Sequence, residues 1–256
     1  GRDFMKDELK RWNKQQSIDW EGNLKDTGFQ LNRAAMGVLF EESDPRYAAW
    51  LEPSPISLDV EALAQTRDEI VRLPGRIIGL AGDLTKTEAE TIAVSVLPPS
   101  SEAPADVEYR FQPIKTERPE KVDVSLPKLT QVYLSHTAPG PSWSDPHYPA
   151  FLIAHHVLGG HFHSRLYMAL RHDDGDTYGV RARSRVFAET GSIELETFSR
   201  LDNAETIETK LRETLQVFHD EGITAQELED AVSHLEGQMR SDRQSPGQVL
   251  NQHIWE

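Results

Sequence analysis

Residues 157–179 read VLGGHFHSRLYMALRHDDGDTYG, and this stretch decides how the rest of the chain is interpreted. A pair of glycines separates two apolar runs within it, and His155 and His156 stand immediately before it. Together with His161 and His163, they place four histidines within nine residues. Clustered histidines are typical of zinc sites, so a metal centre is the first hypothesis to examine.

The spacing of these histidines does not favour a zinc site. His161 and His163 can chelate a cation as an H-x-H pair only if a third ligand comes from the preceding helix. No carboxylate stands at ligand spacing in that helix, and neither H-E-x-x-H nor H-x-x-E-H occurs in the chain. We therefore expect core or solvent-facing histidines here. The possibility of a metal-binding α+β protein that uses His161 and His163 is kept as a weaker alternative to the two functions that are described below.

Other catalytic motifs are also missing from the sequence. It contains no G-x-S-x-G nucleophile elbow, no phosphate-binding P-loop and no dinucleotide fingerprint. Residues 134–146 bring serine, histidine and aspartate together, but these residue types are common in loops and by themselves define no triad. The residues alone therefore predict no catalytic centre.

The composition excludes several classes of protein. The chain has 256 residues, a formal net charge of −15 and no cysteine, so disulfides and thiolate metal sites are excluded. Nucleic acids and anionic membranes need a basic surface, which this charge disfavours as partners. No apolar run approaches the roughly 18 residues of a spanning helix, and no signal peptide is recognisable. We expect a soluble protein of the cytoplasm or periplasm, part of a longer chain, that receives basic or unfolded peptides.

The first part of the chain, residues 1–98, reads as mostly helical. One helix is ended by the Asp-Pro pair at 44–45, and residues 75–83 have the glycine-bounded apolar pattern of a buried strand. Residues 99–128 are rich in proline and charge, contain one expected strand and read as a linker.

The second part, residues 129–256, combines strands and helices. Residues 130–137 read as a strand, and residues 146–158 are apolar nearly all round, which predicts a buried helix. Residues 177–187 and 191–199 alternate with period two around a short turn, which predicts a β-hairpin.

The expected hairpin register sets two arginines against two glutamates, with Arg185 opposite Glu194 and Arg183 opposite Glu196. Opposite charges that face each other across strands contribute a few tenths to about 1 kcal/mol per pair. We prefer this explanation of the arginine run to an anion-binding site.

Two helix starts carry the same T-x-x-E capping box, in which the threonine and the glutamate each satisfy a free backbone N–H. The first box is Thr85 with Glu88, and the second is Thr224 with Glu227. The second box opens the segment GITAQELEDAVSHLEGQM, the clearest helix start in the chain.

Taken together, these segments resemble the C-terminal part of the pitrilysin/insulinase-type zinc metallopeptidases, the inverzincins. The family pattern is a helix, then L-G-G-x-F-x-S-R-L, then L-R, a short acidic or glycine turn, and T-Y. The matching positions here are Leu158-Gly159-Gly160, Phe162, Ser164-Arg165-Leu166, Leu170-Arg171, Gly175 and Thr177-Tyr178. Upstream, the stretches DPRY and GRIIGLAGDLTKTEAE are similar to the end of a preceding homologous domain.

The resemblance implies an α+β fold of two homologous-type domains, each a mainly antiparallel sheet packed with helices. Residues 1–98 would be the closing half of a first, incomplete domain, and 99–128 the linker. Residues 129–256 would be the C-terminal domain, which lacks the zinc motif.

The resemblance also implies a function. These enzymes close two halves around an unfolded peptide, and their zinc lies in the N-terminal domain on an H-x-x-E-H helix. The C-terminal domain supplies an Arg and a Tyr that grip the substrate, and Arg171 and Tyr178 match that pair. By themselves, Arg171 reads as a helix-terminal arginine and Tyr178 as a strand aromatic.

The chain departs from the family pattern where the zinc helix would lie. Residues 152–156 read LIAHH, so the first histidine and the glutamate of H-x-x-E-H are missing and His155 is expected to be a relic position. We expect no cofactor in this chain, which alone would be inactive, and zinc in an N-terminal half or a partner subunit. The expected substrate is an unfolded or short peptide. The alternative is an inactive homologue that serves as a binding or structural subunit, as in processing-peptidase-like pairs.

Overall fold

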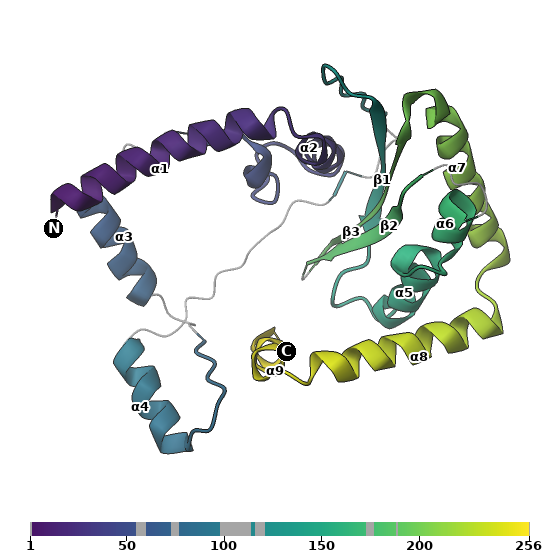
Figure 1. Cartoon of the computed structure of the whole chain (residues 1–256). Coiled ribbons are helices and arrows are strands. Elements are labelled where there is room, and N and C mark those ends of the chain that lie inside the picture. The colour runs from purple at the N-terminus through teal and green to yellow at the C-terminus, as the bar shows by residue number, and fades with distance from the viewer. Residues whose placement is uncertain are drawn as a thin grey trace. The chain divides into compact units, whose positions relative to one another are not determined.

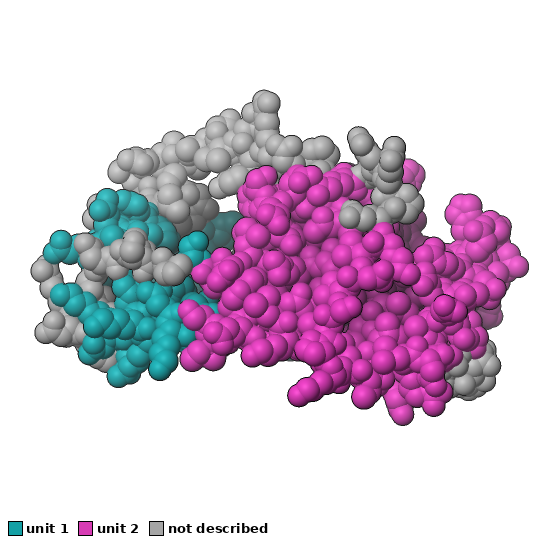
Figure 2. All heavy atoms as spheres, turned by 90° about the horizontal axis from the view of Figure 1, so that it is seen from above, with its two compact units in different colours: residues 1–16, 54–110, 234–256 teal, residues 17–53, 111–233 magenta. Residues whose placement is uncertain are grey.

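The computed structural model describes residues 2–54, 60–72, 77–97, 114–115, 121–172, 177–187 and 189–255. The chain divides into two compact units (Figure 2). Unit 1 comprises Gly1–Gln16, Ser54–Arg110 and His234–Glu256, and unit 2 comprises Ser17–Pro53 and Phe111–Ser233.

Unit 2 is built, in its described residues, on an antiparallel sheet with the strand order β1-β3-β2 (Figure 1). β1 (Gln131–Gly140) and β2 (Val180–Val186) both pair with the central strand β3 (Gly191–Arg200). Successive side chains of a strand point to opposite faces, so the period-two pattern gives this sheet an apolar face and a polar face. The expected strands at 130–137, 177–187 and 191–199 are confirmed, and with them the α+β fold class.

Helices pack on the apolar face of the sheet (Figure 1). They are α5 (Tyr148–His155), the π-helical turn η2 (His156–Gly160), α6 (Arg165–Tyr167), the π-helical turn η3 (Met168–His172) and α7 (Ala204–Glu221). Their shared core consists of buried leucines: Leu158, Leu166, Leu170, Leu195 and Leu211. Burying one such side chain stabilises the fold by about 2 kcal/mol, so these contacts hold the helices to β3.

The expectation of a buried helix over 146–158 is only partly met. α5 has no fully buried residue, and Leu152 is 36% exposed, whereas Val157 and Leu158 of η2 are buried. The reason is that only the end of this helix meets the sheet, where η2 contacts β2.

α2 (Thr27–Leu39) lies on the other face of the sheet, where it packs against β1 (Figure 1). The Asp26 carboxylate caps its start by accepting a hydrogen bond from the Phe29 N–H at 2.7 Å. A second core surrounds this helix and contains Ala35, Met36, Leu39, Phe40, Tyr47 and Ile114, with Phe187 against it. α2 therefore covers the end of the polar face that is near Phe187.

The DPRY turn after α2 folds around a buried ion pair. Arg46 Nη2 lies 2.6 Å from Asp44 Oδ2, and the Arg46 guanidinium lies 4.3 Å from the centre of the Phe40 ring. The hydrogen bonds from Arg46 lower the pKa of the Asp44 carboxyl, while burial of that group acts in the opposite direction. Arg46 Nη1 also donates to the Thr190 hydroxyl at 2.8 Å, so the turn that follows α2 is also bound to the segment just before β3.

The hairpin register differs from the prediction by two residues. Arg183 lies directly opposite Glu194, and Arg185 lies opposite Ser192, so the predicted direct opposition is wrong. The predicted ion pairs form diagonally instead: Arg185 Nε lies 2.8 Å from Glu194 Oε1, and Arg183 Nε lies 3.5 Å from Glu196 Oε2. The long arginine side chains reach diagonal neighbours as easily as opposite ones, so charge pairing alone does not fix the register.

The described part of unit 1 is helical. It contains α3 (Val60–Arg72), α4 (Lys86–Val96), α9 (Pro246–Trp255), the start of α1 (Arg2–Asn23) and the end of α8 (Ala225–Asp242). The capping box of Thr85 with Glu88 is confirmed at the start of α4.

The prediction of a buried strand at 75–83 is wrong for its described part, residues 77–83. No strand forms there, and Ile77, Ile78 and Leu80 are 68%, 38% and 39% exposed. A strand needs a neighbour for its backbone hydrogen bonds, and no strand among the described residues pairs with this segment.

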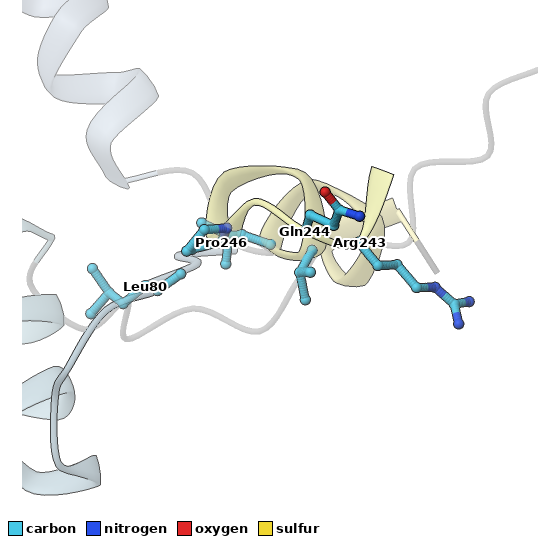
Figure 3. A pocket seen from close by; sticks show the side chains of 7 residues that line it. Leu80, Arg243, Gln244 and Pro246 are labelled. Carbon is cyan, nitrogen blue, oxygen red and sulfur yellow. The ribbon is translucent and has the colours of Figure 1, made fainter. Parts of the chain in front are cut away.

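A shallow pocket of about 370 Å³ lies in unit 1 (Figure 3). Its lining comes from the 77–83 segment, from the turn after α8 and from the start of α9: Leu80, Ala81, Arg243, Gln244, Pro246, Val249 and Leu250. Most of these side chains are apolar, and the pocket holds no cluster of titratable groups, so we assign it no chemistry. No helix in the described part of the chain is long and apolar enough to cross a membrane.

Candidate functional site

The glycine pair of the L-G-G motif allows a helix to approach the sheet closely. A Cβ atom on Gly159 would lie 2.7 Å from the Ala182 Cβ and 3.1 Å from the Ala182 backbone nitrogen. A Cβ on Gly160 would lie 2.8 Å from Nδ1 of His156. The motif therefore builds a corner between η2 and β2 that positions the residues after it.

The four histidines lie at this corner, two before the glycine pair and two after it. His155 is half-buried in α5, and its Nε2 is buried with no hydrogen-bond partner among the described residues. Burial lowers the pKa of His155, while a hydrogen bond to the Arg183 backbone raises it. His156 is buried against His161, with ring centres 4.5 Å apart, and the His163 N–H donates to Nδ1 of His161 at 2.9 Å.

The corner does not fit a catalytic zinc ion. Within the described residues, no group of three or more histidine, aspartate or glutamate side chains is arranged to hold a metal. Zinc needs three or four converging donors, and the LIAHH sequence supplies neither the glutamate nor the first histidine of the family motif.

Arg171 lies at the end of η3, with its side chain exposed. Its Nη1 donates a hydrogen bond to the Tyr167 hydroxyl, and the guanidinium carbon lies 5.1 Å from the centre of the Tyr167 ring. Tyr167 in turn meets the exposed Phe162 edge-to-face at 5.2 Å. Arg171 is thus held over an aromatic ring with most of its donors available to solvent.

Tyr178 stands at the entrance to β2 and is 76% exposed. The buried Thr177 fixes this entrance, because its Oγ1 accepts a hydrogen bond from the Gly179 N–H at 3.1 Å and lies 3.2 Å from the Thr197 hydroxyl. The conformation of the T-Y pair is therefore set by buried polar contacts of Thr177, while its Tyr faces outward. Arg171 and Tyr178 each contact a different aromatic residue.

Tyr178 belongs to a row of aromatic rings that the sequence analysis missed. Its ring stacks on Phe198 with centres 6.3 Å apart and an interplanar angle of 20°, and Phe198 stacks on Tyr133 at 5.6 Å and 21°. Tyr133 and Phe198 are direct partners in the β1–β3 register. The period-two pattern of β3 places Phe198 on the polar face. The rings that Phe198 contacts there depend on the pairing of β1 with β3, which are far apart in the sequence.

Charged residues continue the polar face next to this row. Glu194 is buried and forms the ion pair with Arg185, which also donates to Asn32 Oδ1 of α2 at 2.9 Å. Further along, Arg181 and Arg183 share the single carboxylate of Glu196, at 3.8 and 3.5 Å. At one end of the polar face, the Arg185–Glu194 ion pair is covered by α2. At the other end, near the aromatic row, Arg181 and Arg183 are exposed.

A second feature missed from the sequence is an arginine clamp beside the corner. Arg165 donates through Nε and Nη2 to both carboxylate oxygens of Glu227, at 2.7 and 2.8 Å, and through Nη2 to the Gly222 carbonyl at 2.7 Å. The hydrogen bond from Arg165 lowers the pKa of Glu227 to about 2. Glu227 also closes the predicted capping box with Thr224, which is confirmed. The S-R-L motif thus joins the corner to α8.

The comparisons with known proteins agree with this architecture. A family model described as the peptidase M16 inactive domain matches residues 57–235. A curated relative, the uncharacterised zinc protease YmxG of Bacillus subtilis, is 24% identical over 100 residues, which cover 39% of this chain and 24% of the relative.

Solved structures share the fold. The M16 peptidase inactive domain of Pseudomonas fluorescens superposes with a TM-score of 0.75 at 24% identity, over 96% of this chain and 58% of that one. A chain of complex III from Candida albicans superposes with a TM-score of 0.63 at 12% identity, over 94% of this chain and 58% of that one. The present chain therefore spans less than two thirds of the length of these relatives.

Proposed function

The chain belongs to the family of M16 peptidase inactive domains, and from this premise we propose that it is the peptide-holding, non-zinc-binding portion of a zinc metalloendopeptidase. In this proposal, Arg171 and Tyr178 hold the substrate, and zinc is supplied by an N-terminal half or by a partner subunit. The observation that carries the proposal is the exposed position of both side chains on a domain whose corner does not fit a metal.

The chemistry of the pair suits a peptide backbone. A guanidinium presents a planar fork of donors that a carbonyl oxygen can accept, and a phenol can donate to the same kind of oxygen. Arg171 is exposed and uses Nη1 for its hydrogen bond to Tyr167, and Tyr178 has its hydroxyl on an exposed ring. Both groups can therefore donate to an extended chain without first losing a buried partner.

We also propose the division into a closing half-domain at 1–98, a linker at 99–128 and a C-terminal domain at 129–256. A repeated helix pair supports it. α1 ends at Asn23, three residues before the N-cap Asp26 of α2, and α8 ends at Asp242, three residues before Ser245, the residue that precedes α9. Both caps accept from the backbone N–H three residues on, at 2.7 and 3.2 Å.

The proposal predicts that the chain binds an unstructured peptide and that Arg171→Ala weakens the binding about tenfold. That loss corresponds to about 1.4 kcal/mol, the size of one or two hydrogen bonds from a charged donor. Fluorescence anisotropy of a fluorescein-labelled unstructured peptide measures it, with Tyr178→Phe as the variant that removes only the second donor. Arg212→Ala is the control, because that arginine is exposed on α7 and pairs with Glu208 of the same helix. Equal affinities for the wild type and Arg171→Ala would contradict the role of the pair.

The alternative is a catalytically inactive homologue that acts as a binding or structural subunit. The likeness of the fold to a chain of complex III supports it, since that chain is part of a larger assembly. A zinc-bearing family member mixed with this chain distinguishes the two: peptide cleavage that depends on Arg171 supports the enzyme portion. A stable complex whose cleavage is unchanged by Arg171→Ala supports the structural subunit.

A further inference from the structure

We propose that the open end of the polar sheet face is a subsite for an extended peptide segment that carries an aromatic residue and, two positions away, an acidic residue. We call this surface the aromatic–arginine face and define it by Tyr178, Phe198, Arg181, Arg183 and Glu196. The inference rests on the proposed function and deepens it, because it names the side chains that the peptide-holding domain selects.

The aromatic row provides the first contact. Tyr133, Phe198 and Tyr178 stack with interplanar angles of 21° and 20°, and the row ends at Tyr178, which is 76% exposed. Stacked rings of this kind are stabilised by about 0.5–1.5 kcal/mol per pair beyond the area they bury. Because most of the Tyr178 side chain is exposed, a further aromatic side chain can extend the stack.

An excess of positive charge provides the second contact. Two arginine side chains, Arg181 at 65% and Arg183 at 43% exposed, share the single carboxylate of Glu196, which is 13% exposed. Their distances of 3.8 and 3.5 Å to Glu196 exceed the 2.8 Å of the closed Arg185–Glu194 pair. One carboxylate cannot neutralise two guanidinium groups, so these three side chains together carry one net positive charge, and the two guanidinium groups have more donors than the Glu196 carboxylate can accept.

The spacing of the two contacts matches an extended peptide. Phe198 and Glu196 are two positions apart on β3 and so lie on the same face, at roughly 7 Å from each other. An extended peptide has the same repeat, so a residue that stacks on Tyr178 places its second neighbour beside Arg181, the β2 residue that lies opposite Glu196 in the register. An Asp or Glu side chain at that position would supply the second carboxylate that Arg181 and Arg183 lack.

This local preference differs from the basic or unfolded peptides that the net charge of −15 favours. Charges farther away than a Debye length of about 8 Å are largely screened at physiological salt. The net charge of the chain therefore influences which peptides approach the protein. Once a peptide is bound, Arg181 and Arg183 determine which of its side chains is favoured beside them.

The test compares matched fluorescein-labelled peptides by anisotropy. They are Gly-Ser-Phe-Thr-Glu-Ser-Gly, its Glu-to-Gln form and its Phe-to-Ala form. We expect wild-type chain to bind the Glu peptide about fivefold more tightly than the Gln peptide, as one new charge-assisted contact at a partly exposed site predicts. The double variant Arg181→Gln/Arg183→Gln should bind both peptides equally. Tyr178→Ala should abolish the advantage of Phe over Ala.

Arg212→Gln is the matched control, since it removes one exposed arginine from α7, which packs on the opposite face of the sheet. It should leave the preference for Glu unchanged. Equal binding of the Glu and Gln peptides by the wild type would overturn the subsite while leaving the peptide-holding role intact. A preference that survives in the double variant would overturn it as well, and failure to bind any of the three peptides would overturn both proposals.

Discussion

Gly159→Ala is expected to destabilise unit 2 by about 2–3 kcal/mol, the range of overpacking in a closely packed core. The added Cβ would lie 2.7 Å from the Ala182 Cβ and 3.1 Å from its backbone nitrogen, and neither atom can move without shifting β2. Hydrogen exchange measured by mass spectrometry should show faster exchange of the β2 and η2 amides, because both elements must separate to admit the methyl group.

Gly179→Ala is the matched control for this experiment. Gly179 lies immediately before β2, and a Cβ placed there meets no atom within 4 Å. Exchange in this variant should therefore stay close to that of the wild type. If Gly159→Ala exchanges no faster than Gly179→Ala, the close approach of the corner to β2 is wrong.

Much of the fold could be predicted because its signals are local. Strand alternation, the Asp-Pro stop and both T-x-x-E boxes are written in a few neighbouring residues, and the structure confirms them. The segment 75–83 failed because its apolar residues indicate burial, whereas a strand also needs a partner to receive its hydrogen bonds. The helix over 146–158 forms, but its expected burial is only partly met, because its composition shows that it is apolar but not how much of it the sheet covers.

The candidate site was only partly predictable for the same physical reason. Arg171 and Tyr178 entered through a resemblance to a family, and no local pattern distinguishes them from a helix-end arginine and a strand aromatic. The stack of Tyr178 on Phe198 and Tyr133 depends on the pairing of β1 with β3, which joins segments far apart in the sequence. The sharing of Glu196 by two arginines depends on a register that charge pairing alone did not fix.

Glu227→Gln should lower the stability of the α6–α8 connection by roughly 2 kcal/mol at about pH 7, after allowance for solvent screening of a partly exposed pair. The substitution keeps the shape of the side chain and its capping function, since Gln also closes a capping box. It removes the charge that Arg165 binds through two hydrogen bonds of 2.7 and 2.8 Å. The loss therefore reports the ion pair rather than the helix cap.

The same pair predicts how this difference depends on pH. Because the pKa of Glu227 falls from 4.5 to about 2 on folding, its stabilisation is fully present above about pH 4.5. It is lost as the pH falls from that value toward 2, where the folded carboxylate takes up its proton. The stability of the wild type should therefore approach that of Glu227→Gln across this interval, as followed by exchange of the α8 amides and the loss of helical circular dichroism.

Glu88→Gln separates the ion pair from the capping box, because the chain carries the same T-x-x-E box at Thr85 without an arginine on its glutamate. Hydrogen bonds from Thr85 lower the pKa of Glu88, so this box has a pH dependence of its own, but no guanidinium contributes to it. The effect of Glu88→Gln on α4 should accordingly be much smaller than that of Glu227→Gln on α8. Equal losses of stability in α4 and α8 would show that the capping box, and not the ion pair of Arg165 with Glu227, holds the S-R-L motif to α8.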